Sequence, residues 1–161
     1  MTDPVTITLL GEPVPMAHRT TSDGGRRYVP TKPRNASAAL RLAASEQVGL
    51  VPFDEPVKLV MLCEVAIPNS WSKRKKNAAI LGLIRPGTRP DLTNMLKLAE
   101  DALHGVVWRD DSLVVEQHTK KIYGKQPKLV LTISPIFEGP HKQGYPLRTE
   151  HLYAALTFRS E

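Results

Sequence analysis

The chain has 161 residues and one cysteine, with 41% hydrophobic and 24% charged side chains, a composition typical of one ordinary globular domain. No apolar run approaches the roughly 20 residues that span a bilayer, and the N-terminus lacks the features of a signal peptide, so we expect a cytoplasmic protein without a membrane partner. The 22 Lys and Arg against 16 Asp and Glu give a net charge of +6, which favours polyanionic partners but is weak evidence alone.

The first half of the chain predicts two strands and a helix. Residues 5–10 form the first strand, and a loop rich in Thr, Gly and Arg follows to about residue 33. A helix capped by Asn35 or Ser37 is expected to run to residue 48. Residues 57–67 are almost continuously apolar, which predicts a central strand buried on both faces, with Cys63 as a buried thiol.

The second half predicts a short basic helix, a longer helix and two strands. Ser70 or Ser72 caps the short helix, and apolar residues after its basic start, Leu81 and Leu83 among them, are expected to carry it onto the core. Strands at residues 113–123 and 129–133 are expected to pair antiparallel with each other. This mixture without regular β-α alternation predicts an α+β domain over residues 1–138, with helices packed on a small mixed or antiparallel sheet. The composition of the sequence changes at residues 139–161, which are expected to form a tail or a dimer arm.

The helix at residues 92–104 has the clearest signature. At about 100° per residue, one face carries the apolar residues Leu92, Met95, Leu96, Ala99, Ala102 and Leu103. The other face carries the polar residues Thr93, Asn94, Lys97, Glu100 and Asp101. Asp91 stands at the N-cap position, and Gly105 is a C-terminal stop. The helix therefore offers a polar face between two acidic sites.

Carboxylates cluster around this helix. Asp91 precedes it, Asp110 and Asp111 follow in the next turn, and Lys97 lies on its polar face. Carboxylates suit Mg²⁺, and a lysine suits phosphate, so convergence of these groups would give a site that hydrolyses phosphodiesters. Asp is also the commonest sort of N-cap and is common in turns, so spacing alone leaves both interpretations open.

Two basic groups flank this region. One comprises Lys73, Arg74, Lys75, Lys76, Arg85 and Arg89, and the other Arg19, Arg26, Arg27, Lys32 and Arg34. A charge run is often only a solvated face, but two runs beside a metal site also suit a groove that follows a phosphate backbone. The five histidines lack the spacing of a zinc site and are interpreted as structural or exposed.

Residues 89–116, RPDLTNMLKLAEDALHGVVWRDDSLVVE, resemble the central motif of the RusA family of Holliday junction resolvases. Residues 11–15, Arg19, residues 27–30 and the basic segment 68–76 also resemble family segments in the same order, so the resemblance covers about residues 5–134. It implies a Mg²⁺-dependent endodeoxyribonuclease of DNA recombination and repair, common in phages and prophages, with Mn²⁺ as a possible substitute. It also implies a homodimer that resolves a four-way junction by paired symmetric nicks.

Carried over by position, the resemblance makes Asp91 and Asp111 metal-binding catalytic carboxylates and Lys97 a residue for productive action on the junction. Asn94 and Asp110 match adjacent motif positions, and Asp110 is a further candidate metal ligand. The basic residues Lys73–Lys76, Arg85, Arg89, Arg19 and Arg27 are expected to contact DNA.

Thr93 departs from the family, which commonly has a metal-binding Asp at this position. A neutral hydroxyl removes one negative charge from the site. Four other carboxylates are candidates to compensate for this charge: Glu100, Asp101, Glu116 and Glu64. If nothing compensates, the alternative function is binding of branched DNA with weakened or lost cleavage.

Overall fold

The computed structural model describes residues 4–17, 20–21, 27–28, 30–48 and 52–136. The expected tail from residue 139 and Arg19 lie outside these residues, and the side chain of Arg27 does too. The elements follow in the order β1 (Val5–Leu10), β2 (Thr20–Thr21), β3 (Arg27–Tyr28), α1 (Thr31–Val48), β4 (Val57–Ala66), α2 (Lys73–Ile80), α3 (Leu92–Leu103), the 3-10 turn η1 (Asp111–Leu113), β5 (Val114–Gly124) and β6 (Lys128–Pro135). Helices and a mixed sheet confirm the α+β prediction.

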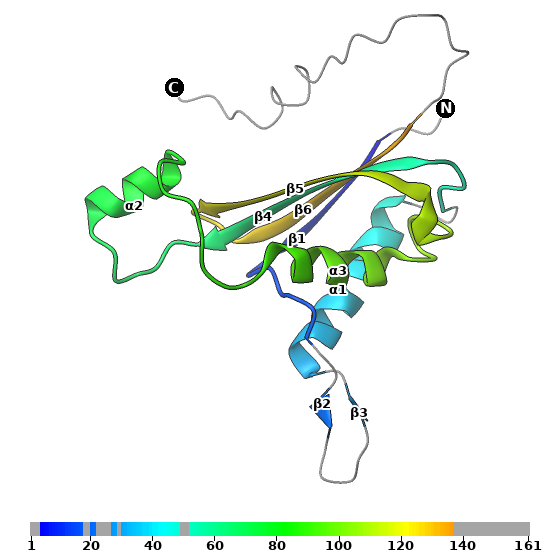
Figure 1. Cartoon of the computed structure of the whole chain (residues 1–161), viewed down its shortest axis with the longest axis horizontal. Helices are drawn as coiled ribbons and strands as arrows, with labels where there is room; N and C mark the ends of the chain where they lie inside the picture. Colours follow the sequence, from blue (N-terminus) through cyan, green and yellow to red (C-terminus); the bar gives the residue numbers. More distant parts are fainter. Residues whose placement is uncertain (1–3, 18–19, 22–26, 29, 49–51, 137–161) are drawn as a thin grey trace, which may run out of the picture.

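Four strands form one sheet in the order β1-β6-β4-β5 (Figure 1). β4 pairs parallel with β5 and antiparallel with β6, and β6 pairs antiparallel with β1. The predicted hairpin between the last two strands is therefore wrong, because β4 lies between them. The strands β2 and β3 pair only with each other.

The side chains of β5 explain its edge position. Its residues on the helix side of the sheet include Gln117, Thr119 and Lys121, which pair in register with apolar residues of β4. A strand with polar side chains on both faces stabilises a sheet poorly at its centre, whereas the apolar β4 suits the centre. β4 is central as predicted, but apart from Lys58 only alternate residues from Val57 to Val65 are buried, so the expectation of burial on both faces is wrong.

The helices α1 and α3 lie against the same face of the sheet (Figure 1). Leu40 and Ala44 from α1 and Met95 and Ala99 from α3 are buried in one core with the inward residues of the sheet. α1 begins at Thr31, four residues or more before the predicted caps. Pro33 lies in its first turn, where a missing backbone N–H costs no hydrogen bond.

The helix α2 lies at one end of the sheet, apart from α1 and α3 (Figure 1). Ser72 is its N-cap as predicted, and Ala79 is buried. Leu81 and Leu83 were expected to reach the core, but both are exposed. No helix in the described part of the chain is long and apolar enough to cross a membrane.

Candidate active site

The helix α3 carries most of the candidate site, and its ends agree with the predicted capping positions. Asp91 occupies the N-cap, but its side chain makes no capping hydrogen bond. Instead its Oδ2 accepts from Nδ2 of Asn94 at 3.4 Å. Gly105 follows the helix with φ of 71°, a conformation that favours glycine and ends the helix. The carboxylate of Asp91 is thus not committed to holding the helix start.

Asp91 lines a hollow of about 520 Å³ together with Pro15, Met16, Arg89, Pro90 and Asn94. The backbone N–H of Met16 donates to the carbonyl of Asn94 at 2.8 Å, which ties the segment after β1 to α3. Arg89 is exposed and brings a positive charge to the same hollow as Asp91. A cation and a carboxylate around one hollow suit a phosphate and a metal ion.

Lys121 of β5 holds the segment that precedes Asp91. Its Nζ donates to the carbonyl oxygens of Thr88 at 2.7 Å and Pro90 at 2.8 Å. The peptide bond between Arg89 and Pro90 is cis. Cys63 lies beside Lys121 in register, and burial raises the pKa of its thiol to about 12, although the charge of Lys121 opposes this. The thiol is therefore protonated, and Lys121 connects the sheet to the Asp91 end of α3.

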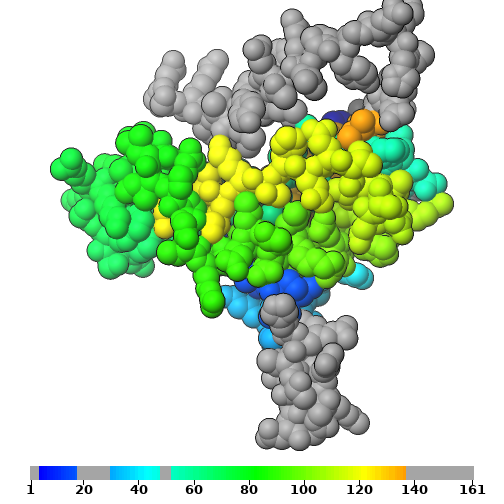
Figure 2. Space-filling view, viewed as in Figure 1, coloured from blue at the N-terminus to red at the C-terminus, as the bar shows by residue number. Residues whose placement is uncertain are grey.

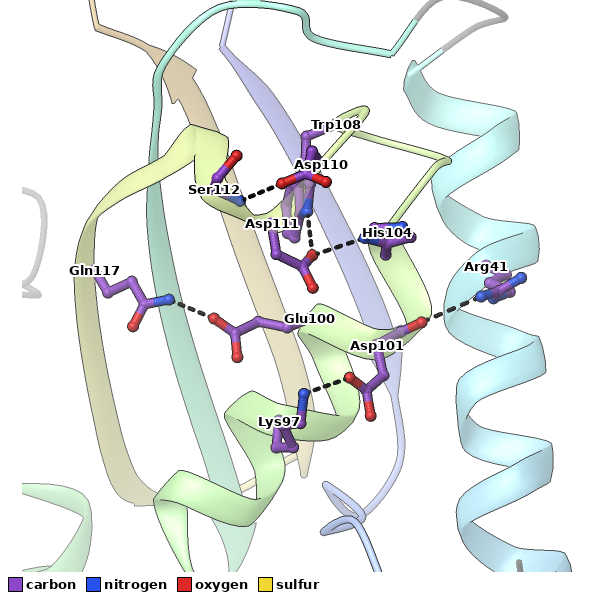
Figure 3. A network of polar contacts seen from close by, with 10 residues as sticks. All are labelled: Arg41, Lys97, Glu100, Asp101, His104, Trp108, Asp110, Asp111, Ser112 and Gln117. Atoms are coloured by element: carbon purple, nitrogen blue, oxygen red, sulfur yellow. Dashed lines mark hydrogen bonds and ion pairs between the residues drawn. The ribbon is translucent and has the colours of Figure 1, made fainter.

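Asp111 lies beyond the other end of α3, next to His104 (Figure 3). Its Oδ1 accepts from Nε1 of the fully buried Trp108 at 2.9 Å and lies 3.1 Å from Nδ1 of His104. Partial burial raises the pKa of Asp111, but these hydrogen bonds and the charges of His104 and Lys97 outweigh it and lower that pKa. Asp111 is therefore ionised and held in one orientation by one oxygen.

Asp110 has a different local role. Its Oδ1 accepts from the backbone N–H of Ser112 at 2.9 Å and caps the turn η1, and hydrogen bonds from Ser112 lower its pKa. The backbone just before this turn is also fixed, because Phe53 pairs with Trp108. The N–H of Phe53 donates to the carbonyl of Val107, and the carbonyl of Phe53 accepts from the N–H of Arg109. These contacts fix the backbone on which Asp111 stands.

Lys97 lies between the ends of α3, paired with an acidic neighbour (Figure 3). Its Nζ donates to Oδ1 of Asp101 at 2.7 Å. This hydrogen bond and the charges of Asp101, Glu100 and Asp111 raise the pKa of Lys97. Glu100 accepts a hydrogen bond from Gln117 of β5. Lys97 is a positive charge surrounded by carboxylates, with 58% of its side chain exposed to solvent.

The structure does not bring Asp91 together with Asp110 and Asp111 in one chain. Thirteen residues of helix, at about 1.5 Å each, put about 20 Å between the Cα atoms of Asp91 and His104, the neighbour of Asp111. Two oxygens on one Mg²⁺ lie at most about 4 Å apart, because each bond is about 2.1 Å long. Among the described residues no three His, Cys, Asp or Glu side chains are grouped to hold a metal. The predicted convergence within one protomer is therefore wrong.

The four carboxylates that could compensate for Thr93 lie on two different faces of the sheet. Glu100 and Asp101 lie on α3 near Lys97. Glu64 instead contacts Lys128 and the backbone of Gln126 near the end of β4. It lies on the face of the sheet opposite the core. Glu116 accepts from Lys58 at 2.8 Å on that same outer face. Glu64 and Glu116 cannot compensate at α3.

The basic segment before Asp91 holds the entire net charge of the chain. Residues 67–90 contain six Lys or Arg and no Asp or Glu, so the remaining 16 basic residues (22 − 6) balance the 16 acidic ones. These six are Lys73, Arg74, Lys75, Lys76, Arg85 and Arg89, and in the described part of the chain none of them forms an ion pair. They occupy α2 and the loop that leads to Asp91, at one end of the molecule (Figure 2).

The comparisons with known proteins agree with this arrangement. The profile of the family described as endodeoxyribonuclease RusA matches residues 11–134. The chain belongs to the RusA family. It is also 31% identical over 139 residues to the uncharacterized protein YqaN of Bacillus subtilis (strain 168), a match that covers 83% of this chain and 98% of that protein. RusA is an endodeoxyribonuclease family, so its members act on DNA.

Three residues of this site were not singled out from the sequence. Trp108 and His104 hold Asp111, and Lys121 supports the segment before Asp91. A tryptophan two residues before an acidic pair was the available signal, because a buried indole N–H needs an acceptor. Lys121 carried no such signal, because a lysine in an edge strand normally points to solvent.

Proposed function

We propose that this RusA-family protein is a Mg²⁺-dependent endonuclease that resolves four-way DNA junctions by paired symmetric nicks. The observation that carries the proposal is the placement of the whole net charge in residues 67–90, which run directly into Asp91 and its hollow. Unpaired cations attract the phosphate backbone by counterion release, independent of base sequence. These cations would guide a DNA strand to Asp91 at the N-terminal end of α3.

The acidic residues suit Mg²⁺ in chemistry. Mg²⁺ takes oxygen ligands and commonly uses one or two protein carboxylates, with water and substrate phosphate completing the octahedron. Among the described residues, nothing donates a hydrogen bond to the second carboxylate oxygen of Asp91 or to that of Asp111. When bound there, the ion would lower the pKa of a water and neutralise the scissile phosphate.

Lys97 has a positioning role for phosphate in this proposal. Asp101 holds its ammonium in place before DNA binds, and the surrounding carboxylates keep it protonated. A phosphate oxygen would share the ammonium with Asp101, because an ammonium offers three donors. Asp110 serves the site through the backbone, as the cap of the turn that carries Asp111.

A homodimer would complete the metal site. Asp91 and Asp111 lie at opposite ends of α3, so two α3 helices related by a two-fold axis and running antiparallel would place Asp91 beside Asp111 of the partner subunit. Each dimer would then contain two such sites. Two equivalent sites match the two symmetry-related strands of a four-way junction.

The alternative is a branched-DNA-binding protein without cleavage. Thr93 motivates it, because it is exposed two residues after Asp91 and supplies no charge. The alternative predicts salt-sensitive junction binding, no nicking with Mg²⁺ or Mn²⁺, and nicking after Thr93→Asp. If the wild type cuts, Thr93→Asp instead lowers the Mg²⁺ concentration needed for half-maximal nicking.

The deciding experiment incubates the protein with a labelled four-way junction and with linear duplex of the same sequence, with and without Mg²⁺. Paired nicks only in the junction and only with metal support the proposal. A stable complex that is never nicked supports the alternative. Nicking of both DNAs at equal rates would contradict junction selectivity.

A further inference from the structure

The turn after α2 exposes three large apolar side chains together. Ile80, Leu81 and Leu83 are 44%, 66% and 76% exposed. The other exposed large hydrophobic residues of the described chain, Leu10, Leu42 and Val115, are separate in sequence. Single exposed leucines are ordinary, but three within four residues form an apolar tip.

The backbone of this apolar tip is fixed. The N–H groups of Gly82 and Leu83 donate to the carbonyls of Ala79 at 3.0 Å and Ala78 at 2.9 Å, and Gly82 has φ of 73°. This pattern is a Schellman motif, in which the residue after the glycine usually packs back on the helix. Leu83 is exposed instead, although the turn is fully hydrogen-bonded. An ordered turn therefore holds Leu83 in its exposed position.

Basic residues flank the apolar tip in sequence, and one of them packs on it. The guanidinium of Arg85 lies 3.6 Å from where a Cβ on Gly82 would be, so it packs on the turn itself. Trp71 fixes the other end of α2. The centroid of its ring lies 3.9 Å from Nζ of Lys75 and 5.2 Å from the ring centroid of Tyr123 of β5. Because residues 67–90 contain six Lys or Arg and no acidic side chain, the segment that carries the tip suits a polyanion.

We propose that Ile80, Leu81 and Leu83 act as a wedge that inserts between unstacked base pairs at the branch point of a DNA junction. Architectural DNA-binding proteins use apolar side chains in this way, with cations on the adjacent phosphates. The cost of unstacking is lower where stacking is already interrupted, so the wedge favours branched over linear DNA. The inference rests on the proposed function and adds to it the element that selects branched DNA.

The test uses a four-way junction with 2-aminopurine either at the branch point or inside an arm, without divalent metal so that no strand is cut. The variant is Leu81→Ser with Leu83→Ser, and the matched control is Leu42→Ser, which removes a leucine that is 61% exposed on α1. We expect the wild type and the control to raise fluorescence at the branch point only. The variant should lose that signal and about tenfold or more of its junction affinity, with duplex affinity changed less than about twofold.

Retention of both signal and selectivity by the variant would overturn the wedge. So would a smaller particle for the variant in light scattering, because the apolar tip would then be a subunit interface. If the wild type binds junctions selectively without a fluorescence rise, the wedge fails and the proposed function stands. If the wild type shows no preference for junctions, both fail.

Discussion

Mixed dimers test where the two candidate catalytic carboxylates meet. Asp91→Asn and Asp111→Asn each remove one carboxylate without changing the size of the side chain. Because about 20 Å separates Asp91 from His104, the neighbour of Asp111, the proposed site combines Asp91 of one protomer with Asp111 of the partner subunit. A dimer of either variant with itself has a lesion in both sites, so each variant alone should not nick.

The mixture should regain activity in a predictable amount. In a heterodimer of the two variants, one site carries both lesions and the other site is intact. Random exchange of subunits makes half of all dimers heterodimers, so about a quarter of wild-type sites return. Each such dimer has one working site, so the expected product is a junction nicked in one strand.

The assay denatures and refolds the two variants together at equal concentration, then follows junction nicking on denaturing and native gels. Each variant refolded with itself is the control for contamination. Full inactivity of the mixture, with subunit exchange confirmed by differently tagged chains, would refute the antiparallel arrangement. Restoration of paired nicks in a large share of junctions would refute it too, because it requires two intact sites in one dimer.

Three further substitutions follow from single contacts. Lys121→Met removes two hydrogen bonds to the segment before Asp91. We expect the free energy of unfolding in urea to fall by about 1–2 kcal/mol. The Mg²⁺ concentration needed for nicking should rise, and Lys121→Arg should restore both properties. Asp101→Asn releases Lys97, so junction affinity should rise and depend more steeply on salt in titrations, and a lower affinity would contradict the pairing. Asp111 has a lowered pKa, so its stabilising contacts are present above its usual value of 3.8 and are lost as pH falls through the folded value. The difference in urea midpoint between the wild type and Asp111→Asn should therefore shrink below about pH 4, and a constant difference would contradict this sign.

The sequence predicted α3 well because several local signals agree there. Apolar periodicity, an Asp at the start and a glycine at the stop all act within one helix, and the observed bounds differ by a single residue. Leu98 is also buried, although it was not assigned to the apolar face. Its burial depends on contacts between elements, which periodicity alone does not report.

The order of the strands was harder to predict from the sequence. Residues 125–127 form a short connection between β5 and β6, and a short connection normally indicates a hairpin. Insertion of β4 between them depends on its long apolar run, which gains most from the central position. Polar residues on both faces of β5 were the available sign that this strand lies at an edge.

The separation of the acidic residues was accessible from the sequence, since a helix of twelve residues is about 18 Å long. Convergence of Asp110 or Asp111 with Asp91 required the helix and the following hairpin to pack side by side. β5 does return, but its first residues stay at the far end of α3. The residue that reaches the Asp91 end is Lys121, three residues before the strand ends.

The uneven charge of the chain has a direct consequence in the proposed dimer. The basic segment precedes Asp91, so each composite site would have one basic segment beside it, supplied by the protomer that supplies Asp91. One apolar tip would then accompany each site, and two tips related by the two-fold axis would address the branch point together. Selectivity for four-way over three-way junctions would follow from this symmetry, since a three-way junction has no two-fold axis.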